Sequence, residues 1–331
     1  MSKTILYNSK KSVSNADWKI IVLDDLTRRF VDYLSQKYNL PNFISPYLLF
    51  KEINLDDFDN FFTPKLKNLL PEPFLFKDLE KGVKRLVDEV VNSRPVGIFG
   101  DYDVDGATST SLLLRFLKDL NTSCEYYIPD RILEGYGPNI NAFKKLKKLG
   151  CDIIVTVDCG ISSNEEVKKA KKEGIEVIIV DHHQQSKILP EAFSIINPNQ
   201  QIDESGLNNL AAVGVTFLLI VAITKKLKLD NFFLKNKEPY LLKYLDLVAL
   251  GTVCDVVKLD LFNRAIVSNG IKIINRTQNL GIKSLIDNTN IKDEINEYHL
   301  GFILGPIILS IFLLKIECGK HANRRSHFLK L

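Results

Sequence analysis

The chain has 331 residues, of which 45% are hydrophobic and 25% are charged, and its formal net charge is +4. These values are ordinary for a globular protein long enough for two domains, so they exclude a disordered or fibrous chain. Five cysteines without a Cys-x-x-Cys pair argue against a disulfide framework. We expect a cytoplasmic protein with no membrane span, since residues 1–15 lack the apolar segment of a signal peptide.

Residues 1–90 are predicted to form a helical N-terminal extension. Residues 76–92 have the apolar spacing of a helix that ends before Pro95. Prolines divide the preceding residues into short segments: Pro41, Pro46, Pro64, Pro71 and Pro73.

Residues 91–306 are predicted to form the main domain, an α/β fold with a doubly wound, mostly parallel sheet flanked by helices. Short β-branched runs alternate there with helical stretches, which is the pattern of such folds. The predicted strands are residues 96–99, 124–128, 153–157, 176–180 and 193–196. The predicted helices between them are residues 107–120, 140–149 and 164–173. Apolar helices at 208–228 and 238–250 would pack against the sheet.

The first predicted strand leads into Gly100-Asp101-Tyr102-Asp103-Val104-Asp105-Gly106. Three carboxylates this close repel one another unless a cation neutralises them, and hard oxygen ligands suit Mg²⁺ or Mn²⁺. In an extended segment, the spacing i, i+2 and i+4 would put all three on one side. The alternative for such a motif alone is a solvated acidic turn.

Two later strand ends favour the metal site over the acidic turn. Asp158 follows residues 153–157, and Asp181-His182-His183 follows residues 176–180. The carboxyl ends of parallel strands share one edge of a sheet, so these side chains should converge there with the three aspartates. Carboxylates and imidazoles together make a metal-binding set.

Five motifs in this order resemble the RecJ family of single-strand-specific DNA exonucleases, within the DHH phosphoesterase superfamily. They are Gly100–Gly106, Tyr127–Arg131 followed by Glu134–Gly137, Val157–Gly160, Asp181–His183 and Ala249–Val256. The resemblance covers residues 15–306. It implies a DHH-domain fold and a metal-dependent 5′→3′ exonuclease that hydrolyses single-stranded DNA to 5′-mononucleotides in DNA repair and recombination. Other DNA repair proteins would be possible partners.

The resemblance also implies two Mn²⁺ or Mg²⁺ ions, because a pair of ions stabilises both the attacking and the leaving oxygen of a phosphoryl displacement. Asp158 is the expected bridge between the ions, and Asp101 would bind directly or through water. Asp181 would orient a neighbouring imidazole, and His183 would donate to the phosphate. The expected metal ligands are Asp101, Asp103, Asp105, Asp158, His182 and Asp255.

Arg131 and Tyr136 are the candidate substrate-binding residues. A guanidinium pairs with a phosphate and a tyrosine ring stacks on a base. The alternative is that Arg131 caps a helix and Tyr136 is a core or turn residue, and the resemblance to a nucleic-acid enzyme favours substrate contact.

The likeness ends at Pro306, and residues 307–331 are expected to be a frameshifted or disordered tail that replaces the second half of a RecJ protein. Activity would then be impaired by truncation. Two other functions stay open: a phosphoesterase acting on short oligonucleotides or cyclic dinucleotides, and an inactive remnant or binding module.

Overall fold

The computed structural model describes residues 3–11, 15, 17–41, 43–50, 53, 55–276 and 279–313. The chain divides into two compact units, residues 1–64 and residues 65–331. The predicted domain boundary after residue 90 stays a prediction.

The first unit begins with an antiparallel β-hairpin, which the sequence analysis did not predict. Its strands are β1 (Lys3–Lys11) and β2 (Asp17–Leu23). The rest is helical, as predicted, with a small apolar core around Leu34, Leu48 and Phe58. The helices are α1 (Asp25–Lys37), α2 (Ile44–Phe50), the 3₁₀ turn η1 (Leu55–Asp57) and α3 (Phe58–Phe62).

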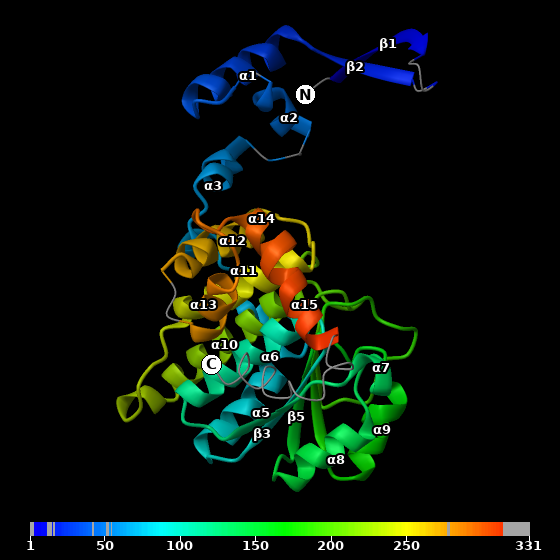
Figure 1. The fold of residues 1–331 in the computed structure, drawn as a ribbon, viewed down its shortest axis with the longest axis vertical. Helices are drawn as coiled ribbons and strands as arrows, with labels where there is room; N and C mark the ends of the chain where they lie inside the picture. Colours follow the sequence, from blue (N-terminus) through cyan, green and yellow to red (C-terminus); the bar gives the residue numbers. More distant parts are fainter. Residues whose placement is uncertain are drawn as a thin grey trace. The chain divides into compact units, whose positions relative to one another are not determined.

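The second unit contains the predicted parallel sheet (Figure 1). Its strands lie side by side in the order β4-β3-β5-β6-β7, and each neighbouring pair is parallel. The strands are β3 (Val96–Gly100), β4 (Cys124–Tyr127), β5 (Ile153–Val157), β6 (Glu176–Val180) and β7 (Ser194–Ile196). The predicted doubly wound fold is thereby confirmed.

Helices and short turns make up the remainder of this unit. Those before and between the strands are α4 (Leu66–Leu69), η2 (Pro73–Leu75), α5 (Leu79–Val91), α6 (Val104–Asp119), α7 (Arg131–Glu134), α8 (Ile140–Lys148) and α9 (Asn164–Lys172). Those after the sheet are α10 (Ala212–Leu229), η3 (Phe232–Leu234), η4 (Leu241–Tyr244), α11 (Leu245–Cys254), α12 (Leu261–Ile274), α13 (Leu280–Asp287), α14 (Glu297–His299), the π-helical η5 (Leu300–Leu304) and α15 (Gly305–Leu313).

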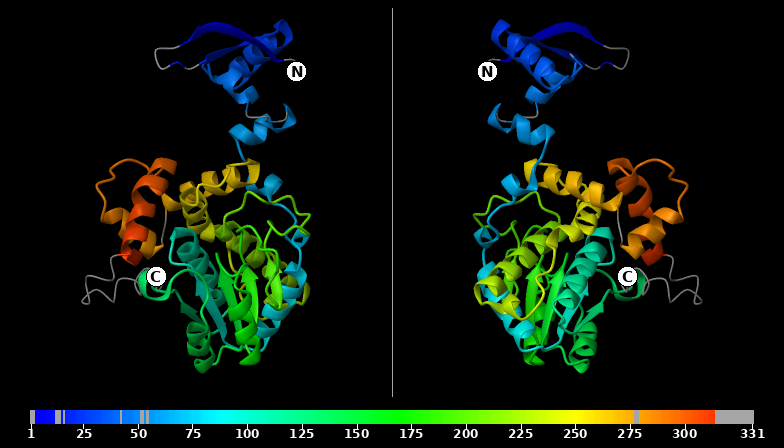
Figure 2. Two further views of the ribbon diagram at one scale, coloured as in Figure 1. Left: turned by 90° about the vertical axis from the view of Figure 1, so that its right-hand side faces the viewer. Right: turned by 90° about the vertical axis from the view of Figure 1, so that its left-hand side faces the viewer.

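Two helical layers bury both faces of the sheet (Figure 2). On β5, Ile153, Val155 and Val157 face the larger core, which includes residues of α5, α6, α10 and α11. Ile154 faces the smaller core with residues of α8 and α9. Strands buried on both faces read as continuous apolar runs, which is why their bounds follow the sequence prediction closely.

Two further expectations concern the C-terminal tail and the absence of a membrane span. Residues 305–313 form α15, so the first part of the predicted tail is helical, while residues 314–331 lie outside the described residues. Among the helices that the structure describes, none combines the length and apolarity needed to cross a membrane.

Candidate metal centre

The candidate site lies where the strand order reverses. The chain places β3 beside β5 at the centre of the sheet and runs outward in both directions from there. Asp101 directly follows β3, Asp158 follows β5 and Asp181 follows β6. Ligands of open parallel sheets bind outside the carboxyl ends of the strands at such a reversal, so the predicted convergence of these residues agrees with the topology.

The turn between β3 and α6 is tighter than an extended segment, which corrects the prediction for the three alternating aspartates. Asp103 is the N-cap of α6 and accepts a hydrogen bond of 2.9 Å from the Gly106 backbone N–H, while Asp105 already lies in the first helical turn. A Cβ on Gly106 would be 2.5 Å from the Asp101 carbonyl oxygen, so this turn requires glycine. The three carboxylates therefore separate into two groups instead of sharing one side.

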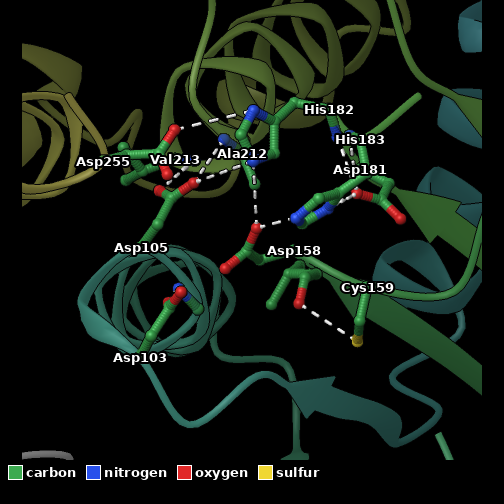
Figure 3. Close-up of polar contacts among 12 residues, drawn as sticks. Asp103, Asp105, Asp158, Cys159, Asp181, His182, His183, Ala212, Val213 and Asp255 are labelled. Atoms are coloured by element: carbon green, nitrogen blue, oxygen red, sulfur yellow. Dashed lines mark hydrogen bonds and ion pairs between the residues drawn. The ribbon is translucent and has the colours of Figure 1, made fainter. Parts of the chain in front are cut away.

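Asp105 joins α6 to the start of α10 (Figure 3). Its two carboxylate oxygens accept hydrogen bonds from the backbone N–H groups of Ala212 (2.6 Å) and Val213 (2.9 Å). α10 begins at Ala212, and its N-cap Ala211 has only a methyl group, which cannot cap the helix. Asp105 therefore satisfies N–H groups that would otherwise lack partners. The carboxylate is thereby fixed from a second element.

Asp158 has a left-handed backbone, with φ of 62°, and the residue is 1% exposed. Asp tolerates this conformation better than most residues. Neither carboxylate oxygen has a hydrogen-bond partner among the described residues, and Oδ1 lies 3.3 Å from Nε2 of His182. A buried carboxylate without partners is costly, so this geometry favours a cation as the partner of Asp158.

The two histidines have different surroundings. Asp181 is buried and accepts hydrogen bonds at Oδ1 from Nδ1 (2.7 Å) and the backbone N–H (3.1 Å) of His183, and at Oδ2 from the Ile161 N–H (3.0 Å). Burial alone would raise the pKa of Asp181, but these bonds bring it below its ordinary value. The hydrogen bond to Asp181 raises the pKa of His183. Burial and the neighbouring His183 lower the pKa of His182, which favours the neutral imidazole that binds metals.

Four aspartates of the site have raised pKa values. Burial, followed by the nearby Asp103, raises the pKa of Asp101 to about 7 and that of Asp255 to about 6. Burial and neighbouring aspartates hold the pKa of Asp105 and of Asp158 well above the usual range. A bound cation would remove this repulsion, so the charges fit a metal centre.

In the part of the chain that the structure describes, potential metal-ligand atoms form three groups, in each of which the atoms lie within 4.8 Å of one another. All six predicted ligands and His183 belong to at least one group. Asp158 and His182 each occur in two, which suits positions between neighbouring ions. The groups are Asp101, Asp103 and Asp158; Asp105, His182 and Asp255; and Asp158, His182 and His183. Within these groups, the buried atoms that have no hydrogen-bond partner among the described residues are Asp101 Oδ1, Asp158 Oδ1 and Oδ2, His182 Nε2 and Asp255 Oδ2.

The predicted substrate residues lie beside these groups. Arg131 is the first residue of α7, and its guanidinium carbon is 5.1 Å from the centre of the Tyr102 ring. Tyr136 is 58% exposed, its hydroxyl donates to the Asp158 carbonyl oxygen at 3.5 Å, and its ring packs edge-on against Tyr102 and His183. The Tyr136 ring and the Arg131 guanidinium are therefore both accessible to a ligand.

Two contributions to the site were not predicted from the sequence. Tyr102 lies within the acidic motif and contacts both Arg131 and Tyr136, so its place between two aspartates was an available signal. The N–H groups of Ala212 and Val213 bind Asp105 from more than 100 residues away in sequence, and no local pattern indicates this pairing.

Comparison with protein families matches residues 95–252 to the N-terminal domain of the DHH family. This part of the chain is therefore similar to a DHH domain. The match spans the strands and helices that carry every candidate metal ligand except Asp255, which lies three residues beyond it.

Curated relatives support the resemblance to RecJ. The single-stranded-DNA-specific exonuclease RecJ of Bacillus subtilis (strain 168) is 39% identical over 236 residues, which is 71% of this chain and 28% of that protein. The RecJ of Escherichia coli (strain K12) is 38% identical over 247 residues, or 73% of this chain and 42% of that protein. The chain therefore spans less than half the length of these relatives.

Solved structures of RecJ share the fold. Exonuclease RecJ bound to manganese has a TM-score of 0.60 and 28% identity, covering 77% of this chain and 64% of that one. RecJ from Thermus thermophilus in complex with Mn²⁺ has a TM-score of 0.58 and 25% identity, covering 77% and 37%. The resemblance to RecJ predicted from the motifs is thereby confirmed.

Proposed function

We propose that this chain is a Mn²⁺- or Mg²⁺-dependent nuclease that hydrolyses single-stranded DNA from the 5′ end and releases 5′-mononucleotides. The observation that carries the proposal is the set of buried ligand atoms without hydrogen-bond partners on Asp101, Asp158, His182 and Asp255, among the residues that the structure describes. Solved RecJ structures with bound manganese support the choice of metal, and the RecJ relatives support single-stranded DNA as the substrate. A role in DNA repair with other repair proteins as partners is part of the proposal only.

In this proposal the six metal ligands form two adjoining sites. Asp101 and Asp103 would hold one ion together with Asp158, and Asp105 and Asp255 would hold the other. His182 adds a neutral nitrogen to the second site. When bound, the divalent ions would neutralise the phosphate and activate water for in-line attack.

Residues of the chain would orient the substrate around the ions. Asp181 occupies Nδ1 of His183, so Nε2 is the ring nitrogen left for a phosphate oxygen. The raised pKa of His183 favours the protonated ring, which donates a hydrogen bond and carries positive charge. Arg131 would pair with a neighbouring phosphate, and Tyr136 would stack on a base.

The test is hydrolysis of a single-stranded oligonucleotide in Mn²⁺ by the full chain, with 5′ and 3′ labels in parallel. Mononucleotides released first from the 5′ label are expected. Asp158→Asn should abolish release, whereas Asp152→Asn should not, because Asp152 is an exposed aspartate paired with Lys147 just before β5. Equal activity of wild type and Asp158→Asn would refute the site.

The same assay separates the other functions. Cleavage of dinucleotides or cyclic dinucleotides in preference to long single strands would replace the proposal with a small-substrate phosphoesterase. Calorimetric Mn²⁺ binding without hydrolysis of any of these substrates would replace it with a metal-binding module.

A further inference from the structure

The two histidines of the site lie just beyond the last hydrogen bond of the sheet. The ladder between β6 and β7 ends at the pair Val180–Ile196, and the final backbone bond runs from the Asp181 N–H to the Ile196 carbonyl oxygen (3.1 Å). From His182 onward the backbone has left the sheet, so its carbonyl groups need other partners.

Two asparagines of the loop formed by residues 197–210 supply those partners. The Asn197 side chain donates from Nδ2 to the His183 carbonyl oxygen at 2.9 Å. The Asn199 side chain donates from Nδ2 to the His182 carbonyl oxygen. Consecutive carbonyls of the histidine pair are thus held by two side-chain amides two residues apart.

The asparagines are themselves held in place. Asn197 is fully buried, and its Oδ1 accepts a hydrogen bond from the Asn199 backbone N–H (2.7 Å). Asn208 donates from Nδ2 to Asn199 Oδ1 (3.2 Å) and to the Pro198 carbonyl oxygen (2.7 Å). Each amide therefore uses its donor toward a histidine and its acceptor within the loop.

The 197–210 loop is anchored at two further points. Asp203 accepts a hydrogen bond of 2.8 Å from the Lys77 backbone N–H, next to α5. Asn263 on α12 donates to the Asn209 carbonyl oxygen at 2.7 Å. The loop then leads into α10, whose first N–H groups bind Asp105. One segment therefore binds both His182, through Asn199, and Asp105, which belong to the same group of potential ligands.

We propose that Asn197 and Asn199 are positioning residues that fix the imidazoles of His183 and His182 for metal and phosphate binding, an inference that rests on the proposed function. A side-chain amide carries both an N–H donor and an oxygen acceptor, so each asparagine can donate to a histidine carbonyl and accept from the loop at the same time. Hydrogen-bonded partners of metal ligands typically affect affinity or activity by about 10–100-fold when removed, because they set ligand orientation.

The decisive variant is Asn197→Asp, which keeps the side-chain shape and the acceptor toward Asn199 but replaces the donor with an oxygen that repels the His183 carbonyl. Gln200→Glu is the matched control. Gln200 is a buried amide of the same loop that donates to the carbonyls of Ile195 and Asn197 and to neither histidine. Asn199→Asp repeats the test at a half-buried position if Asn197→Asp does not fold.

Two measurements on the full chain are made without DNA. The first is the imidazole ¹⁵N spectrum of the metal-free protein, with His299 as an internal reference and His182→Gln and His183→Gln as assignments. The second is calorimetric Mn²⁺ affinity. We expect the Asn variants to move the His182 and His183 signals and to weaken Mn²⁺ binding by about 10–100-fold, while Gln200→Glu changes neither.

Unchanged histidine signals in the Asn variants would overturn the inference, as would equal changes in Gln200→Glu, because the loop would then act only on overall stability. A wild-type chain that is inactive on DNA would refute the proposed function alone, since both measurements are independent of hydrolysis.

Discussion

Replacing Asp158 by Asn should stabilise the metal-free protein while abolishing its response to metal. Asp158 is buried among other carboxylates. Asp101 and Asp103, which belong to the same group of potential metal ligands, each have a carboxylate oxygen within 4.8 Å of a carboxylate oxygen of Asp158. At that separation one charge pair repels by about 3.5 kcal/mol at an effective dielectric constant of ~20, and by about 0.9 kcal/mol in water. Asn keeps the shape, tolerates the left-handed backbone and donates to a neighbouring carboxylate.

The gain in stability of the metal-free Asp158→Asn protein should depend on pH. Folding raises the pKa of Asp101 to about 7 and of Asp255 to about 6, so the stability linked to their protonation is present at low pH and is lost as pH rises through those values. The repulsion is therefore largest at pH 8. We expect Asp158→Asn to raise the free energy of unfolding by about 1–3 kcal/mol at pH 8 and by less at pH 5.

Urea unfolding followed by circular dichroism, in EDTA and in Mn²⁺, measures both effects. Manganese at a hundred times its dissociation constant should stabilise the wild type by about 2.7 kcal/mol and Asp158→Asn by almost nothing, which reverses their order. Asp152→Asn is the control, because Asp152 is exposed. A metal-free Asp158→Asn protein less stable than the wild type at pH 8 would refute the reasoning, as would an equal response to Mn²⁺.

Three other variants test further contacts of the same unit. Gly251→Ala should lower the free energy of unfolding by about 1–3 kcal/mol in urea titrations, because its methyl group would clash with α6, while Gly301→Ala, with its nearest neighbour at 3.4 Å, should change it little. Asp181→Asn should lower the free energy of unfolding by about 2 kcal/mol. The full loss is expected between pH 3.8 and pH 6.5, the ordinary pKa values of Asp and His; it should shrink at lower pH, where Asp181 protonates at its lowered pKa, and at higher pH, where His183 deprotonates at its raised pKa. Equal losses at pH 5.5 and pH 9 would contradict this. Arg131→Gln should raise KM for single-stranded DNA several-fold with kcat unchanged in steady-state assays, and an unchanged KM would remove Arg131 from the substrate site.

Local sequence patterns were sufficient where burial alone decides the structure. The bounds of β5 and β6 equal the predicted ones, because strands covered on both faces must be apolar throughout. The strand ends then located Asp158, Asp181 and the histidines. The spacing of the three aspartates was misleading, since helix α6 begins at Val104 and turns Asp105 away from Asp101 and Asp103.

Contacts between distant segments were beyond such patterns. The hairpin of β1 and β2 was missed because the apolar residues of Lys3–Lys11 are grouped instead of alternating, which removes the period-two signal. Asp105 finds its partners at Ala212 and Val213, and Asn197 finds His183, through the tertiary fold. Local propensity carries no information on these pairs.

The same contacts explain how a cluster of like charges folds before it binds a cation. Asp105 is stabilised by the N–H groups at the start of α10, and Asp181 by three N–H groups and the His183 ring. Asp158 and Asp255 have buried oxygens without hydrogen-bond partners among the described residues, and the His182 ring lies 3.3 Å from Asp158 Oδ1 and 3.6 Å from Asp255 Oδ2. Binding of a cation should therefore stabilise Asp158 and Asp255 most. The charges of these two side chains increase metal affinity and lower the stability of the metal-free protein, whereas the charge of Asp181 does not lower that stability.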